Sequence, residues 1–73
     1  MAVIFQRFDQ QQKEMVDIGV LIDNEIHGDE SIPARGLNLD ADGIEDHVVK
    51  IYSSRTLNAV KVPDDEVDID DYQ

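Results

Sequence analysis

The chain has 73 residues, of which 17 are acidic and 6 are basic, so its formal net charge at pH 7 is −11. This length allows one small domain, and because the chain has no cysteine, no disulfide can stabilise it and no thiolate can bind zinc. Phosphate groups would be repelled, so the charge argues against direct binding to nucleic acid or to an anionic membrane surface. A basic protein surface is the expected partner. Small domains without disulfides often gain stability by association, so a homodimer is a further hypothesis.

The first third of the chain predicts a β-hairpin. Residues 2–8 (AVIFQRF) are rich in strand-forming residues, and residues 15–23 (MVDIGVLID) alternate between apolar residues and others. On this pattern Val16, Ile18, Val20 and Ile22 share one face. The polar residues 9–14 would form the connecting loop. A helix is the alternative, because apolar residues between Ile4 and Ile22 also fit one helical face.

Turn-forming residues dominate the middle of the chain. Residues 23–36 contain two glycines and a proline, which predicts a loop with a short extended piece around Ile26. Residues 37–39 (LNL) are expected to form a short strand that leads into an acidic turn at Asp42 and Gly43.

Two further strands are expected at 47–53 (HVVKIYS) and 56–62 (TLNAVKV), joined as a hairpin through residues 53–55 and ended by Pro63. A helix at 43–53 is the alternative, with Asp42 and Glu45 spaced as a capping box. The predicted fold class is therefore mainly β, a small antiparallel sheet of about four strands, or α+β if residues 43–53 are helical. The core is expected to contain Phe5, Phe8 and Tyr52.

The C-terminal segment is the most acidic part of the sequence. Residues 1–63 are expected to form the globular domain, whereas residues 64–73 contain six acids and no base. This segment would be an acidic tail or an edge strand. If it were extended, Glu66, Asp68 and Asp70 would lie on one side and Val67 and Ile69 on the other.

Residues 38–43 begin like a calcium-binding EF-hand loop, with Asn38, Asp40, Asp42 and Gly43 at the first, third, fifth and sixth positions. The twelfth position requires a bidentate glutamate but is Val49, so an acidic turn is expected instead. His27 and His47 are too few and too distant in sequence to indicate a zinc site. We therefore expect no cofactor and no metal.

No serine or threonine lies in a nucleophile motif, and there is no phosphate-binding loop, so an enzyme is not expected. The sequence has no apolar run long enough to span a membrane and no signal-peptide pattern at its start. These features predict a cytoplasmic protein, located in the host cytoplasm if a phage encodes it.

In size, charge and acidic C-terminal segment, the chain resembles the small acidic proteins that bacteriophages make to inhibit host DNA-binding proteins. These include uracil-glycosylase inhibitors, restriction decoys and inhibitors of the histone-like HU proteins. The resemblance implies a DNA mimic that binds the basic nucleic-acid-binding surface of a host protein. An HU-type nucleoid-associated protein is the preferred target, and RNA polymerase and nucleases are rivals.

The residues expected to contact such a partner are the acids of two patches and one aromatic residue that would anchor the interface. They are Asp40, Asp42, Glu45, Asp46, Asp64, Asp65, Glu66, Asp68, Asp70, Asp71 and Tyr72. The alternative function is a small structural, assembly or adaptor protein whose acidity only provides solubility.

Overall fold

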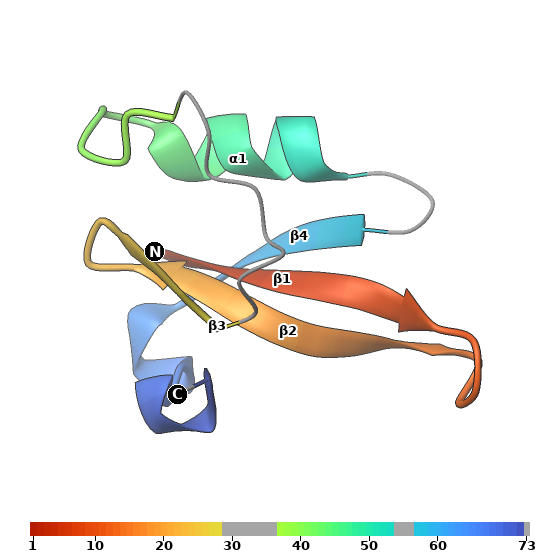
Figure 1. The fold of residues 1–73 in the computed structure, drawn as a ribbon. Helices are drawn as coiled ribbons and strands as arrows, with labels where there is room; N and C mark the ends of the chain where they lie inside the picture. The colour runs from red at the N-terminus through yellow and green to blue at the C-terminus, as the bar shows by residue number, and fades with distance from the viewer. Residues whose placement is uncertain (29–36, 54–56, 73) are drawn as a thin grey trace.

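A computed structural model describes residues 1–28, 37–53 and 57–72 of the chain. Four antiparallel strands form one sheet in the order β3-β2-β1-β4. One helix covers one face of this sheet, and two short 3-10 helices lie against the other (Figure 1). The expectation of a mainly β fold is confirmed, with one helix added. The elements are β1 (Ala2–Asp9), β2 (Glu14–Ile22), β3 (Glu25–Gly28), α1 (Ile44–Tyr52), β4 (Leu57–Val62), η1 (Asp64–Glu66) and η2 (Ile69–Tyr72).

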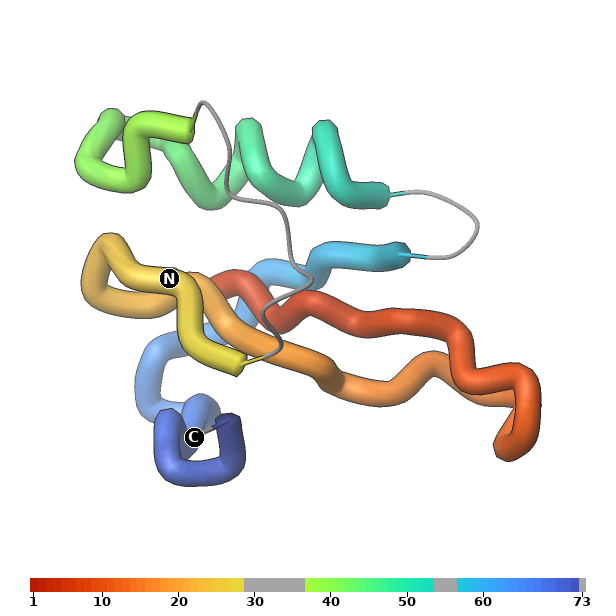
Figure 2. Tube along the Cα trace, in the orientation of Figure 1, coloured from red at the N-terminus to blue at the C-terminus, as the bar shows by residue number. Residues whose placement is uncertain are grey.

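The predicted hairpin of the first two strands is present as β1 and β2, so the helical alternative for this region is wrong. Asp9 shapes the turn because its carboxylate accepts hydrogen bonds from the backbone N–H groups of Gln11 and Gln12, at 2.8 and 3.3 Å. The N–H of Lys13 donates to the carbonyl oxygen of Asp9 at 2.7 Å. The end of the hairpin extends away from the helix as a two-stranded arm (Figure 2).

A β-bulge interrupts the alternation predicted for β2. Phe5 lies opposite Gly19 and Gln6 lies opposite Asp17, which leaves Ile18 as an extra residue without a cross-strand partner. A bulge shifts the side-chain alternation by one residue. Ile18 therefore packs against the apolar cluster under α1, whereas Val20 and Ile22 lie on the opposite face. The prediction that these three residues share one face was wrong for this reason.

A tight turn at Asp23 and Asn24 leads into β3, which occupies the place where a short extended piece around Ile26 was predicted. Both turn residues have positive φ angles, of 53° and 64°. β3 ends at Gly28, with φ of 118°, where a Cβ atom would lie 2.4 Å from the carbonyl oxygen of Ile18. Residues 29–36 of the predicted loop lie outside the described residues, and residues 37–39 do not form the expected strand.

Residues 44–52 form a helix, so the strand predicted at 47–53 is wrong and the helical alternative is confirmed. Ile44, Val48 and Tyr52 are spaced by four, which places all three on the buried face of α1. The helix is preceded by Gly43, with φ of 75°, and no side chain caps its N-terminus, so the expected capping box is absent. β4 pairs with β1 instead of forming a hairpin with 47–53. Residues 54–56 of that predicted hairpin lie outside the described part of the chain.

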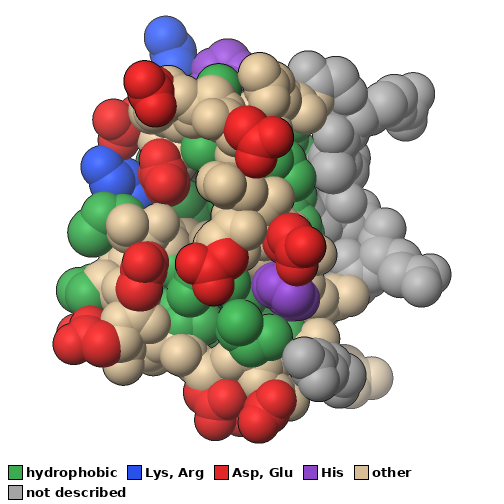
Figure 3. Space-filling view, turned by 90° about the vertical axis from the view of Figure 1, so that its left-hand side faces the viewer, with side chains coloured by type: hydrophobic (Ala, Val, Ile, Leu, Met, Phe, Trp, Pro, Cys, Tyr) green, Lys and Arg blue, Asp and Glu red, His purple; other side chains and the backbone are tan. Residues whose placement is uncertain are grey.

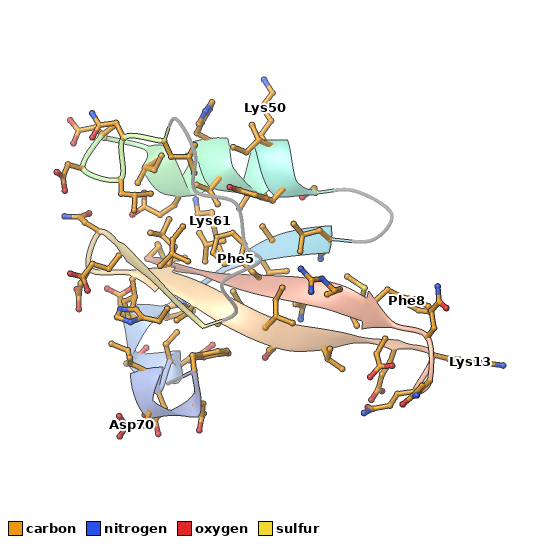
Figure 4. The ribbon with its side chains drawn as sticks, viewed as in Figure 1. Phe5, Phe8, Lys13, Lys50, Lys61 and Asp70 are labelled. Carbon is orange, nitrogen blue, oxygen red and sulfur yellow. The ribbon has the colours of Figure 1, made fainter. Side chains whose placement is uncertain are left out.

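Apolar side chains cover both faces of the sheet, with one cluster on each face. The cluster between the sheet and α1 includes Phe5 and Tyr52, whose rings meet edge to face with centroids 5.3 Å apart. On the opposite face, Ala2, Val20 and Ile22 are covered by apolar side chains of the C-terminal segment. Phe8, which was expected in the core, is 42% exposed, because it lies on the arm beyond both clusters (Figure 4). Within residues 1–28, 37–53 and 57–72, no helix has the length and apolar character needed to cross a membrane.

Candidate functional site

Acidic residues from three separate segments meet at one end of the molecule. They surround a cavity of about 220 Å³, lined by Met1, Leu21, Ile22, Asp23, Asn24, Ile44, Glu45 and Asp64. Asp23 comes from the β2–β3 turn, Glu45 from the first turn of α1, and Asp64 from the start of η1. Figure 3 shows this end, with Asp and Glu side chains spread over almost its whole height.

We call this region the acidic end. It is made of the cavity acids and the further acids on the loop before α1, on α1 and on the C-terminal segment. In Figure 1 the segments that carry these acids lie toward one end of the ribbon. The acids in these segments are Asp23, Asp40, Asp42, Glu45, Asp46, Asp64, Asp65, Glu66, Asp68, Asp70 and Asp71. The two patches expected from the sequence thus lie toward the same end but on opposite sides of the sheet, because α1 covers one face and the C-terminal segment the other.

The first patch is held by a turn and by the start of α1. The backbone N–H of Asp40 donates to the Asn38 side-chain oxygen at 3.2 Å, which fixes the loop and leaves Asp40 and Asp42 exposed. Asp46 is different, because it accepts a hydrogen bond from the Lys61 ammonium at 2.6 Å. This bond, the Asp46 charge and the nearby Glu45 charge raise the pKa of Lys61. Asp46 is therefore partly neutralised within the chain, whereas Asp40 and Asp42 remain available.

The second patch is carried by η1 and η2, not by an extended strand. The expected row of carboxylates along one side of a strand is therefore not formed. The backbone N–H of Asp70 donates to a carboxylate oxygen of Asp68 at 3.0 Å, and this bond helps to fold the segment back on itself. Val67 and Ile69 pack on the cluster of Ala2, Val20 and Ile22, which leaves the acids of the segment facing outward and exposed. Asp70 lies at the far edge of this region in Figure 4.

Tyr72 packs within the chain and is half-buried against the same cluster. Burial raises the pKa of Tyr72, and the charges of Asp17 and Asp71 and a hydrogen bond to Asp17 add to the effect. Gln6 also donates to Asp17, at 2.9 Å, and Asn58 donates to Gln6 at 3.4 Å. A polar row thus runs across three strands to the C-terminal segment. The ring of Tyr72 holds this segment in place, and a contact with a partner stays a prediction.

The sequence analysis missed Asp23 and Lys61. Asp23 lies between the two acidic patches in space, but no pattern in the sequence showed that the β2–β3 turn would meet α1. The turn itself could have been expected, because Asp-Asn between two apolar stretches tolerates positive φ angles. The basic residues Lys13 and Lys50 lie away from the acidic end, on the arm and on the outer side of α1 (Figure 4).

Among the described residues, no three His, Asp or Glu side chains are grouped closely enough to hold a metal ion. His27 has one carboxylate neighbour, Glu25, with 3.6 Å between Nε2 and Oε2, and His47 is exposed on α1. Two carboxylates of the acidic end are paired within the chain, Asp46 with Lys61 at 2.6 Å and Asp64 with the N-terminal ammonium at 3.4 Å. The other acids are separated from one another, an arrangement that fits recognition of several cationic side chains.

A scan of protein-family models, a search of curated protein sequences and a search of solved structures each returned no match to this chain.

Proposed function

We propose that the protein is an acidic DNA mimic, which binds the basic nucleic-acid-binding surface of a host protein and inhibits its DNA binding. One observation carries this proposal: three segments far apart in the sequence place their acids at one end of the fold. Acids that only provided solubility would not need to be gathered in this way. The preferred partner is an HU-type nucleoid-associated protein, with RNA polymerase and nucleases as rivals, and the proposed location is the cytoplasm.

The charge density of the acidic end is comparable with that of DNA. Duplex DNA carries one negative charge per about 1.7 Å of axis. Asp46 pairs with Lys61 and Asp64 with the N-terminal ammonium, so the other nine acids equal roughly 15 Å of duplex. The two smaller dimensions of the protein are 24 and 20 Å, so this charge is presented over a similar length. A basic groove that binds phosphates would therefore meet a similar number of charges on the protein.

The fold holds these charges on short, well-anchored elements. Glu45 is on a helix that packs on the sheet, and Asp64 is separated from the end of β4 only by Pro63. Val67, Ile69 and Tyr72 fix the remaining acids of the C-terminal segment. Preorganisation reduces the entropy lost on binding, so an anchored array is expected to bind better than a free acidic tail.

A pull-down with matched variants tests the proposal. The variant Asp23→Asn, Glu45→Gln, Asp64→Asn removes three charges around the cavity and is compared with a control that removes three charges elsewhere. This control is Asp9→Asn, Glu14→Gln, Asp17→Asn on the hairpin, and both triple variants have a net charge of −8. Asparagine keeps a side-chain oxygen that can accept the hydrogen bonds of Asp9 and Asp17, so the turn and the contact with Tyr72 are retained. We expect a purified HU-type protein to be retained at low salt by the unchanged chain and the hairpin variant, and retained weakly by the cavity variant.

The expected weakening is about tenfold, because three exposed ion pairs at roughly 0.5 kcal/mol each sum to about 1.5 kcal/mol, and a tenfold change in affinity corresponds to about 1.4 kcal/mol. High salt should release the partner, since exposed charges are screened within about 8 Å at physiological ionic strength. Equal retention of the two triple variants would show that only net charge matters, and that the acidic end is not the binding site.

The alternative function, a structural or assembly protein, is favoured by a different feature, the open edge of β4. It predicts that the chain binds further copies of itself and no basic protein. Removal of residues 63–73 would not separate the two functions, because it would also expose the cluster of Ala2, Val20 and Ile22. The charge variants are the better test, because they leave this packing intact.

A further inference from the structure

We propose that the outer edge of β4 pairs with the same edge of a second copy, which would give a two-fold dimer with a continuous eight-stranded sheet. β4 is the last strand in the order β3-β2-β1-β4, and no other described strand pairs with its outer side. A strand edge presents backbone N–H and C=O groups that can pair with another chain. This inference does not depend on the proposed function.

The two edges of the sheet differ in how they are protected. β3 has four residues, carries Glu25 and His27, and ends at Gly28 in a conformation that stops regular pairing. β4 has six residues, with no proline and no acid among them, and Pro63 comes only after its end. Lysines often protect a strand edge, but Lys61 is directed to Asp46 of α1 at 2.6 Å. The edge of β4 therefore lacks most of the features that prevent strand addition.

Charge also favours this edge as the place where two copies meet. Each copy has a net charge of −11, so any contact between copies is opposed by repulsion except where acids are scarce. β4 contains no acid, and its Lys61 is paired with Asp46 of α1. The adjacent β1 contains one acid, Asp9, which lies beyond the part of β1 that pairs with β4. In α1, which packs over β4, both acids, Glu45 and Asp46, lie in the first turn, and the rest of the helix contains Lys50 and no acid. Antiparallel pairing would also turn the two acidic ends in opposite directions.

The alternation of side chains selects the register. Ala59 belongs to the cluster under α1 and Lys61 reaches α1, so Val60 between them points to the other face and is 40% exposed. The α1 helices of the two copies lie on the same face of the joined sheet only under one condition. Residues that face each other across the two β4 strands must have side chains that point to the same face of the sheet. We infer that Val60 faces Val60 of the second copy, which buries two exposed β-branched side chains against each other. A register centred on Lys61 would instead place two like charges opposite each other.

The absence of cysteine makes this register directly testable. Directly opposite residues in antiparallel strands have Cα atoms about 4.5 to 5.5 Å apart, which is within the range that a disulfide can bridge. Under mild oxidation, Val60→Cys is expected to form a cross-linked dimer of twice the 8.3 kDa chain mass, visible on a non-reducing gel. Phe8→Cys is the matched control, because Phe8 is similarly exposed, at 42%, but lies away from the edge.

Cross-linking of Val60→Cys at least about tenfold faster than Phe8→Cys would support the dimer, whereas equal rates would overturn it. Sedimentation of the unchanged chain gives a second test. Self-association should strengthen with salt, because salt screens the repulsion between copies, whereas binding to a basic partner should weaken. Val60→Lys should be monomeric and Val60→Thr, which keeps the branched shape, should still associate. A single 8.3 kDa species at millimolar concentration and high salt would overturn the proposal.

Discussion

Replacing Phe5 and Phe8 separately with alanine tests the packing of the fold, because the same change is made on one strand at a buried and at an exposed site. Phe5 is 0% exposed and its ring meets that of Tyr52, whereas Phe8 is 42% exposed on the arm. Removing a buried phenylalanine ring costs about 3–5 kcal/mol, because a cavity is left behind. Complete burial of a side chain of this size stabilises the folded state by at most about 3 kcal/mol. The half-exposed Phe8 should therefore contribute roughly 1 kcal/mol to the unfolding free energy.

These costs are large compared with the stability of so short a chain. At about 0.05–0.15 kcal/mol per residue, 73 residues give an unfolding free energy of roughly 4–11 kcal/mol. Phe5→Ala would then remove about a quarter or more of the stability, and Phe8→Ala a smaller part. Urea unfolding followed by circular dichroism measures both, and urea is preferred because guanidinium chloride would also screen the charges. Equal costs, or a larger cost for Phe8→Ala, would refute the packing described here.

Three further results are expected. Gly28→Ala should destabilise the protein more than Gly43→Ala in urea unfolding, because a Cβ at Gly28 would lie 2.4 Å from a backbone oxygen and a Cβ at Gly43 meets open space; equal losses would contradict the β3 pairing. Burial raises the pKa of Tyr52, and a hydrogen bond to Asp46 raises that of Lys61. Both groups hold their protons more tightly in the folded protein than in the unfolded chain. Their contribution to the unfolding free energy is therefore full below about pH 10 and falls as the pH rises through the raised pKa values. Thermal unfolding at neutral and at alkaline pH measures the stability lost as the pH rises. Tyr52→Phe should make this loss smaller, and a loss equal to that of the unchanged chain would contradict the burial of the Tyr52 hydroxyl. Finally, the double variant Asp23→Asn, Glu45→Gln should raise the melting temperature at low salt, because repulsion around the cavity falls. Asp64 is left unchanged because it pairs with the N-terminal ammonium at 3.4 Å. A lower melting temperature would mean that Asp23 and Glu45 stabilise the fold.

The hairpin of β1 and β2 could be predicted because alternation over residues 15–22 and the polar residues between the strands are local features. The bulge at Ile18 could not, because it depends on how β2 pairs with β1 and with β3 at Gly19 and Gly28. Gly19, next to Ile18, is a residue type that often marks a bulge within a strand, but it does not show which residue is the extra one. The face on which Ile18 packs was therefore wrong, while the strand itself was confirmed.

The strand predicted at 47–53 shows how tertiary packing decides between two structures of similar local preference. Val48, Val49 and Ile51 are β-branched and favour strands, but Ile44, Val48 and Tyr52 share a helical face. Packing of that face on the sheet buries all three side chains, and this outweighs the local preference. The same limit applies to the acidic end: the charge of each patch is evident in the sequence, but their meeting with Asp23 depends on where α1 and the C-terminal segment dock.

Displacement of DNA from a purified HU-type protein tests the central claim most directly. A fluorescent duplex bound to that protein is titrated with the chain, and anisotropy reports the DNA that is released. The account predicts displacement at low salt that weakens as salt rises, about tenfold weaker displacement by Asp23→Asn, Glu45→Gln, Asp64→Asn, and little change for Asp9→Asn, Glu14→Gln, Asp17→Asn. Bound DNA that stays bound at low salt, or an equal loss in the two triple variants, would contradict it.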